Sequence, residues 1–256
     1  MEGGSVMSDL VTLTRTLAEP DRDLVVLAEG NTSMRTGDCE MLVKASGSQM
    51  GTATEADFVA VRTQPLLDLV ASDSTDDALV NRTLLDARLD ADAPKPSMEA
   101  LLHALCLEEA GAEVVAHTHP TAVNGILCSD RAQELVAGAL FPDQVVVMGR
   151  HNVLVPYADP GLALARAVRT ELLRHLAVHD RPPKVIYLVN HGIFVLAAST
   201  AEALAVTEMT VKAARILAGA LAVGKPVHLT DAEAERIDTR PDELHRRRRL
   251  ASREDR

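Results

Sequence analysis

Hydrophobic positions along the chain recur with two different periods, and the longer period predicts helices. In 6–19 leucines recur every three or four residues, and the pattern stops at Pro20, whose ring cannot continue a helix. Ser199 and Glu202 form a capping box ahead of a long apolar stretch that runs to about Leu221. The remaining helices are predicted at 65–70, 78–89, 97–110 and 161–176, with one more beginning at Pro120.

Short runs rich in β-branched and apolar residues predict strands between these helices. The runs are 41–44, 58–61, 113–117, 145–148, 153–155, 184–189 and 193–196. Two polar segments, 29–33 and 45–51, are predicted to be turns or loops. Helices and strands alternate too irregularly for a Rossmann repeat, and no GxGxxG motif is present. The pattern therefore predicts a layered α/β structure.

We expect one domain over residues 1–230 and a charged C-terminal tail over residues 231–256. The stretch 245–256 contains four consecutive arginines, which is typical of a solvated terminus. A tail that contacts phosphate or a neighbouring subunit is the alternative.

The composition excludes several classes of partner. The chain has 256 residues, 47% of them hydrophobic, which is enough for one large packed domain. Aromatic residues make up 2% and the net charge is −11, so neither base stacking nor attraction to phosphate backbones favours nucleic acid. The three cysteines form no CxxC motif, and neither a signal peptide nor a run of about 18 apolar residues is visible. We therefore expect a cytoplasmic protein without a membrane partner.

Three histidines are the first candidates for chemistry. Residues two apart in a strand point to the same face, so His117 and His119 could bind one divalent ion, although this spacing also occurs by chance. His191 stands between Asn190 and Gly192, where the glycine permits a positive φ or a close approach. A hydrogen-bonded turn histidine is the alternative there. Three convergent histidines that leave a coordination position open would make a catalytic site rather than a structural one.

Glu99 and its neighbours are the second candidate. Pro96-Ser97-Met98-Glu99 begins a predicted helix. In its first turn the Glu99 carboxylate could simply be stabilised by the helix dipole, or it could bind a metal or act as a general base. His103 lies four residues later on the same helical face, either as a metal partner of Glu99 or as a packing and hydrogen-bonding residue.

Two polar loops offer hydroxyl and backbone N–H groups. The segments 30–33 and 45–48 suit an anion such as phosphate or carboxylate, although ordinary turns use the same residues. Lys44 precedes the second loop and could add a positive charge to an anion site, or it could protect an edge strand from aggregation.

Taken in order, these segments resemble the class II aldolase/adducin family, whose members include fuculose-phosphate and rhamnulose-phosphate aldolases. The matching segments are Gly30-Asn31-Thr32-Ser33, Lys44-Ala45-Ser46-Gly47, Pro96-Ser97-Met98-Glu99, His117-Thr118-His119 and Asn190-His191-Gly192. They fall within about residues 10–221 and are particularly similar to the aldolase module that is fused to a dehydrogenase in rhamnulose-phosphate-aldolase-like proteins. These 256 residues contain no dehydrogenase portion.

The resemblance implies a fold, a metal site and an assembly. The implied fold is a three-layer α/β/α single domain with a mixed, largely antiparallel central sheet, in a protein that forms a homotetramer. His117, His119 and His191 correspond to ligands of Zn²⁺ or of another divalent metal such as Mn²⁺ or Co²⁺. Glu99 corresponds to the catalytic carboxylate.

The resemblance also implies a substrate and a reaction. The residues that fall where the family binds the substrate phosphate are Asn31, Ser46, Gly47 and Ser97. The implied substrate is a small sugar phosphate or sugar acid. The implied reaction is retro-aldol cleavage of a phosphorylated ketose through a metal-bound enediolate.

Two departures from the family pattern bear on the substrate and on the proton donor. Family phosphate sites often carry two hydroxyl residues before the glutamate, whereas here Met98 follows Ser97, so a non-phosphorylated or carboxylated substrate stays open. The family uses a tyrosine to protonate the aldehyde oxygen. Tyr157 is a better catalytic candidate than Tyr187, which lies in a predicted core strand. His151 or a residue of a neighbouring subunit is the alternative.

Other reactions remain open beside aldol cleavage. Decarboxylation of a 3-keto sugar acid and 4-epimerisation need the same metal-bound enediolate, so these residues do not separate them. A non-catalytic adducin-like module is a further alternative, but it predicts eroded ligands, whereas the three histidines and the glutamate are intact.

Overall fold

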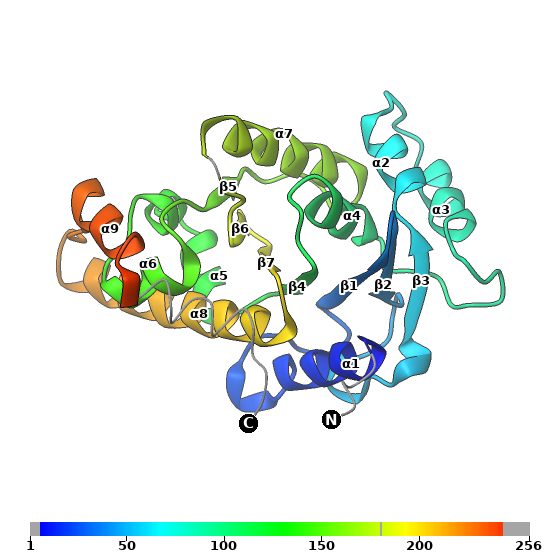
Figure 1. The fold of residues 1–256 in the computed structure, drawn as a ribbon, viewed down its shortest axis with the longest axis horizontal. Helices are drawn as coiled ribbons and strands as arrows, with labels where there is room; N and C mark the ends of the chain where they lie inside the picture. Colours follow the sequence, from blue (N-terminus) through cyan, green and yellow to red (C-terminus); the bar gives the residue numbers. More distant parts are fainter. Residues whose placement is uncertain (1–5, 180, 243–256) are drawn as a thin grey trace.

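A seven-stranded sheet forms the middle layer of the molecule. The computed structural model describes residues 6–179 and 181–242 (Figure 1). Within these residues the strands are β1 (Asn31–Gly37), β2 (Glu40–Lys44), β3 (Phe58–Arg62), β4 (Val114–Thr118), β5 (Val153–Val155), β6 (Val185–Leu188) and β7 (Gly192–Ala197). Their order in the sheet is β3-β2-β1-β4-β7-β6-β5. Neighbours pair antiparallel except β5 and β6, which are parallel.

Helices cover both faces of this sheet (Figure 1). The helices on one face are α2 (Gln64–Ala71), α3 (Asp77–Asp86), α4 (Ala100–Glu108) and α7 (Leu162–Val178). The helices on the other face are α1 (Val6–Leu17), α5 (Thr121–Leu127), α6 (Pro142–Met148) and α8 (Thr200–Val223). The described residues also form short 3₁₀ helices between these elements, at Pro20–Arg22, Met50–Thr52, Glu55–Asp57 and Ala132–Val136. The three-layer α/β/α prediction with a largely antiparallel sheet is therefore confirmed.

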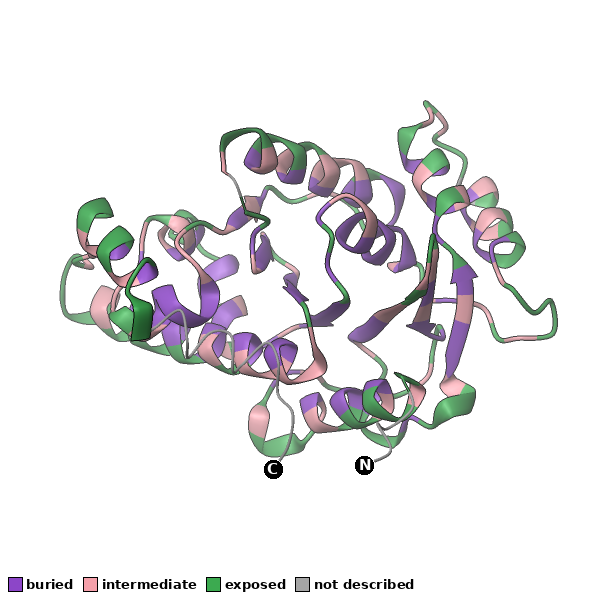
Figure 2. Ribbon diagram, in the orientation of Figure 1, coloured by how far each residue is buried: buried purple, intermediate pink, exposed green. Residues whose placement is uncertain are grey.

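Alternation along the central strands divides the core in two. In β4, Val114 and Ala116 pack on the α8 side, whereas Val115 packs on the α4 side. His117 has the same parity as Val115, and its ring stacks on Phe194 of β7, its cross-strand neighbour, at 4.3 Å between centroids. Figure 2 shows the central strands buried throughout. Burial of one large apolar side chain stabilises a fold by about 1.5–3 kcal/mol. Strands β4 and β7 are buried on both faces, so we expect them to hold the residues at their ends rigidly.

Three local predictions were wrong. Residues 145–148 are not a strand but the end of helix α6, because a short apolar run has no period that separates a buried helix from a strand. Residues 31–33 are not a turn but the start of β1, where pairing with β2 and β4 overrides their polar character. The helix predicted from Ser97 begins at Ala100 instead, since residues 97–99 form a separate turn.

The capping box at the start of α8 is present only in part. The Ser199 hydroxyl accepts the Glu202 backbone N–H at 3.1 Å, as predicted. The Glu202 carboxylate, however, accepts from the backbone N–H of Ala198 at 2.7 Å and pairs with Lys184 at 2.6 Å. Glu202 therefore ties α8 to the segment that enters β6.

The C-terminal segment begins with ordered structure. Helix α9 (Asp231–Asp238) packs on α6, where Ala234 joins Ala139 and Val145 in a small apolar cluster. The arginine run of residues 246–249 lies outside the described residues. No helix in the described part of the chain is long and apolar enough to cross a membrane. Each cysteine is a free thiol.

Candidate metal and catalytic site

Three histidines from separate parts of the chain meet at one end of the sheet. His117 lies in β4, His119 follows that strand, and His191 lies in the turn between β6 and β7. One ligand nitrogen from each lies within 4.8 Å of the others. The ring centroids are 4.7 Å apart for His117 and His119, and 5.0 and 4.9 Å from each of these to His191. The structure therefore brings together the predicted ligand set.

The second nitrogen of two of these rings has a fixed partner. Nδ1 of His117 donates to the carbonyl of Ile193 at 2.9 Å, and Nδ1 of His119 donates to the Glu29 carboxylate at 3.0 Å. Since these partners only accept, the lone pairs of both rings are on Nε2. The two Nε2 atoms face each other at 2.9 Å, and a metal ion bound by both lone pairs would relieve the repulsion between them. The donor set therefore fits a divalent metal.

Glu99 lies beside two of the three imidazoles. Its Oε1 is 3.1 Å from Nε2 of His117 and 3.3 Å from Nε2 of His191, and its Oε2 accepts from Asn31 at 2.6 Å. Burial by itself would raise the pKa of this carboxyl, but His117, with the hydrogen bonds from His191 and Asn31, holds that pKa well below its usual range. Glu99 is thus a largely buried carboxylate, held by Asn31 on one oxygen and facing two imidazoles with the other.

Two glycines permit the close packing around these rings. A Cβ atom on Gly192 would lie 2.5 Å from the Thr118 carbonyl oxygen and 2.6 Å from Cδ2 of His119. Gly30 has φ +75°, and its Cβ would lie 2.7 Å from Sδ of Met50 and 3.0 Å from the His117 carbonyl oxygen. Any larger residue at Gly192 would therefore push the His119 ring out of place.

The turn that carries His191 is held at both ends. Asn190 adopts the left-handed conformation with φ 56°, and the backbone N–H of His191 donates to the Leu188 carbonyl at 3.1 Å. Nδ2 of Asn124, from α5, donates to the His191 carbonyl at 2.9 Å. His191 therefore lies in a turn between two strands, as predicted, and Asn124 is a supporting residue that the sequence analysis missed.

A cavity of about 250 Å³ opens beside Glu99 and His119. The four residues predicted for substrate binding all line it, namely Asn31, Ser46, Gly47 and Ser97. The other side chains that line it include Glu29, Lys44 and Met98. The two polar segments and the turn before α4 therefore border one space, with the carboxylate and one imidazole at its wall.

Lys44 is a buried cation in this wall. Strand β2 lies between β1 and β3, so Lys44 does not protect an edge, and that alternative was wrong. Its Nζ donates to the carbonyl oxygens of Ala45 and Ser48. Burial lowers the pKa of Lys44, while Asp57 and Glu99 act in the opposite direction. The ammonium group thus places positive charge at the cavity with no carboxylate within salt-bridge distance among the described residues.

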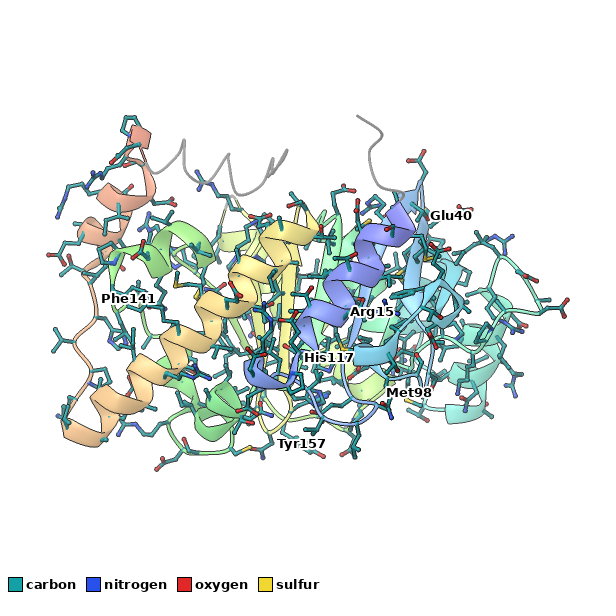
Figure 3. All side chains as sticks on the ribbon, turned by 90° about the horizontal axis from the view of Figure 1, so that it is seen from below. Arg15, Glu40, Met98, His117, Phe141 and Tyr157 are labelled. Atoms are coloured by element: carbon teal, nitrogen blue, oxygen red, sulfur yellow. The ribbon has the colours of Figure 1, made fainter. Side chains whose placement is uncertain are left out.

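The predicted proton donors lie elsewhere. Tyr157 is 58% exposed, its hydroxyl donates to Asp159 at 3.0 Å, and it is absent from the residues that line the cavity. In Figure 3 it lies at the edge of the molecule, with His117 nearer the centre. The His151 ring stacks on His179 at 4.1 Å, in a different cluster. Tyr187 is buried in β6, as predicted.

Two polar residues contribute to the site in ways that the sequence analysis left open or missed. His103 is fully buried and hydrogen-bonded, which confirms the packing alternative. Glu29 had no predicted role, although it borders the cavity and accepts from His119. A carboxylate two residues before Asn31 in a polar segment was the only sequence signal for it.

Comparisons with known proteins identify the family of this chain. Residues 8–218 match the model of the family described as Class II Aldolase and Adducin N-terminal domain. The chain is 26% identical over 233 residues to 3-oxo-tetronate 4-phosphate decarboxylase of Haemophilus influenzae, covering 90% of this chain and 95% of that protein. It is 30% identical over 182 residues to the uncharacterized oxidoreductase YuxG of Bacillus subtilis, covering 68% of this chain but only 24% of that larger protein.

A solved structure of L-fuculose 1-phosphate aldolase has the same fold. The superposition has a TM-score of 0.68 and covers 93% of this chain and 96% of the aldolase chain. The identity is 19%, so this likeness concerns the fold alone.

Proposed function

The chain belongs to the class II aldolase and adducin family, and from that premise we propose that it is a divalent-metal-dependent carbon–carbon lyase acting on a phosphorylated, sugar-like ketone. The observation that carries the proposal is the position of Glu99, whose Oε1 lies 3.1 and 3.3 Å from the Nε2 atoms of His117 and His191. A carboxylate in contact with two of three convergent imidazoles joins a proton-transfer group to a candidate metal site, and cleavage through a metal-stabilised enediolate uses both.

In this proposal His117, His119 and His191 hold the ion, which is Zn²⁺ or a divalent ion such as Mn²⁺ or Co²⁺. When bound, such an ion acts as a Lewis acid and stabilises negative charge on substrate oxygens by several kcal/mol. The support comes from the two Nε2 atoms that face each other at 2.9 Å, with their Nδ1 atoms bound to acceptors. Neutral imidazoles preserve the full charge of the ion.

The anionic end of the substrate binds to the polar residues that line the cavity with Glu99. Ser46, Gly47 and Ser97 offer hydroxyl and backbone N–H groups there, and the buried Lys44 ammonium adds a positive charge. The distance between this wall and Glu99 sets which carbon of the substrate meets the carboxylate. A phosphorylated or carboxylated substrate fits this charge better than a neutral sugar.

In retro-aldol cleavage, the hydroxyl group next to the breaking bond gives its proton to water and becomes an aldehyde. The electron pair of the broken carbon–carbon bond moves to the ketone fragment, which becomes an enediolate. Glu99 takes up a proton from water, delivers it to the enediolate carbon and so completes the ketone product. The same carboxylate removes that proton when the reaction runs backwards, so proton exchange on the ketone fragment is a direct sign of the proposed step.

Decarboxylation is the second candidate, and one observation favours it. The Haemophilus relative that aligns over 95% of its length is named 3-oxo-tetronate 4-phosphate decarboxylase. Loss of carbon dioxide from a phosphorylated 3-oxo acid leaves the same enediolate on a phosphorylated ketone, which Glu99 would protonate in the same way.

Product analysis tests the proposal. Metal-loaded protein is incubated with a panel of phosphorylated ketoses and with a 3-oxo acid phosphate, and aldehyde, carbon dioxide and phosphorylated ketone are measured. Aldehyde plus ketone identifies the aldolase, and carbon dioxide plus ketone identifies the decarboxylase. A stereoisomer alone would identify a 4-epimerase instead. A protein that takes up no divalent metal and turns over none of the panel would contradict the proposal and favour an adducin-like module.

The predicted homotetramer stays a prediction. Light scattering of the purified protein tests it, and a monomer at working concentration would be the contrary result.

A further inference from the structure

A line of buried polar side chains extends from Glu99 into the space between β1 and α4. Nδ2 of Asn31 donates to Oε2 of Glu99 at 2.6 Å and to Oγ of Ser97 at 3.2 Å. Oδ1 of Asn31 contacts Nε2 of His103, and Nδ1 of His103 lies 2.6 Å from Oγ of Ser33. Ser33 and His103 are both 0% exposed.

The chemistry of these groups fixes the direction of every hydrogen bond in the line. The Glu99 carboxylate only accepts, so the amide NH₂ of Asn31 must face it and the amide oxygen must face His103. Nε2 of His103 therefore carries the proton. A neutral imidazole then has its lone pair on Nδ1, and the Ser33 hydroxyl donates to it.

Burial keeps the imidazole neutral. Desolvation, with a smaller contribution from His117, lowers the pKa of His103 to about 3, while Glu99 acts in the opposite direction. Each member of the line thus has one stable protonation state near neutral pH. A line with one allowed direction holds its last member more firmly than a line whose amide can flip.

We propose that Ser33, His103 and Asn31 form a relay of fixed direction that positions the Glu99 carboxylate for proton transfer. The relay occupies Oε2 of Glu99 and leaves Oε1 to face the imidazoles of His117 and His191. The inference rests on the proposed function, because Glu99 needs a defined orientation only if it moves a proton.

The relay also changes the role of Asn31. Both N–H groups of its amide are already donated, to Glu99 and to Ser97, so Asn31 has none left for the anionic group of a substrate. Ser97 differs, since its Oγ accepts from Asn31 and from the Glu99 backbone N–H at 3.3 Å. The Ser97 hydroxyl proton is therefore the group left to donate into the cavity. Asn31 is a positioning residue, and Ser97 is the anion contact.

The first test is kinetic and uses dihydroxyacetone phosphate, a small phosphorylated ketone, in D₂O. Deuterium entering its carbon–hydrogen bonds is followed by NMR with metal-loaded protein. His103→Phe removes both hydrogen bonds with little change in shape, and we expect exchange to slow by about 10- to 100-fold. KM should stay within about threefold of wild type and bound metal should be unchanged, because only the orientation of Glu99 is affected.

Three further variants separate positioning from folding. His103→Gln keeps a donor towards Asn31 and should recover most of the exchange rate. Ser33→Ala leaves the imidazole in place and keeps the test valid if His103→Phe does not fold. We expect the deuterium exchange rate of Ser33→Ala to fall a few-fold. His175→Phe is the matched control, since His175 is also buried, at 8% exposure, and does not border the cavity. It should exchange at the wild-type rate.

The second test needs no turnover. Nitrogen-15 NMR of the imidazoles between about pH 5 and 8 should show His103 neutral and protonated on Nε2. A His103 ring that is protonated on Nδ1 or charged would overturn the relay. So would deuterium exchange at the wild-type rate in His103→Phe, or a loss of bound metal in that variant as large as its loss of exchange rate. If wild type itself exchanges no deuterium, the proposed function has failed, and the tautomer of His103 alone decides the relay.

Discussion

Two clusters of three histidines lie in the described part of the chain, and the nitrogens of one cluster converge as a metal site requires. In the first, His117, His119 and His191 meet edge to face, with interplanar angles of 72°, 82° and 64°. In the second, near α7 and α9, His151 and His179 stack at 4.1 Å with an angle of 14°. His175 lies 4.6 Å from His179 at 48°. Stacked rings do not aim their nitrogens at a common point.

The hydrogen bonds behind the rings explain the difference. In the first cluster, Nδ1 of His117 and Nδ1 of His119 each donate to a fixed acceptor, which turns Nε2 inward. In the second cluster, Nε2 of His175 donates to the Arg181 carbonyl at 3.1 Å. Closeness of imidazoles therefore does not make a metal site; the partners of their outer nitrogens do.

The largest expected effect follows directly. His119→Ala removes one of three ligand nitrogens and should abolish metal retention after dialysis, because two imidazoles hold a divalent ion far more weakly than three. His179→Ala is the matched change in the other cluster and should retain metal like wild type. The metal content of both variants is measured after dialysis. If both retain the same amount of metal, the first cluster is not the metal site.

Glu99→Gln should come next in size. The amide cannot carry the proton, so turnover should fall by about 10²- to 10⁴-fold, while the imidazoles still hold metal. Steady-state kinetics and metal content are measured on the same preparation. Turnover like that of wild type would show that Glu99 has no catalytic role.

Gly192→Ala tests whether the packing behind the rings matters. The new Cβ would lie 2.6 Å from Cδ2 of His119, so the ring must move. We expect metal affinity to fall by about 10- to 100-fold and the free energy of unfolding to drop by about 1–3 kcal/mol. Calorimetric titration with Zn²⁺ and urea unfolding measure the two effects. Unchanged affinity would mean that the backbone relaxes without disturbing His119.

Ser46→Ala acts at the other wall of the cavity and should have a smaller effect. Loss of a hydrogen bond to a charged group would weaken binding of a phosphorylated substrate by about 1.5–3 kcal/mol, seen as a higher KM with little change in kcat. Substrates without the phosphate serve as the control. If both kinds of substrate respond alike, Ser46 does not bind the anion.

The smallest effect concerns pH and the second cluster. Burial, then His179 and Arg150, lower the pKa of His151 below 6.5, although Asp231 and Asp238 act in the opposite direction. The unfolded chain therefore binds more protons than the folded chain below that pH, so this contribution to stability is present above about pH 6.5 and is lost as the pH falls. His151→Gln should lose less stability than wild type between about pH 7 and 5 in urea unfolding. The same dependence of the free energy of unfolding on pH in both proteins would show that His151 does not contribute.

The layered α/β structure could be predicted from the sequence because it depends on local hydrophobic patterns. For the first cluster, the residues themselves offered only the two-residue spacing of His117 and His119 and the glycine after His191, and the full ligand set came from the family resemblance. The error at 145–148 had the same origin, since four buried apolar residues give no period by which a helix can be told from a strand.

What the sequence could not predict depends on contacts between distant segments. Nothing in the chain indicates that the Asn31 amide is saturated by Glu99 and His103, which lie 68 and 72 positions away. The same holds for Glu29, whose partner His119 is 90 positions away. Tyr157 illustrates the limit from the other side, since residue type and strand context suggested a proton donor that the fold leaves exposed outside the cavity.

Anomalous diffraction at the zinc edge from zinc-soaked crystals tests the central claim most directly. We predict one strong peak about 2.0–2.1 Å from the Nε2 atoms of His117, His119 and His191, with an open coordination position towards the cavity. No peak at these three nitrogens, or a peak only at the cluster of His151, His175 and His179, would contradict the account.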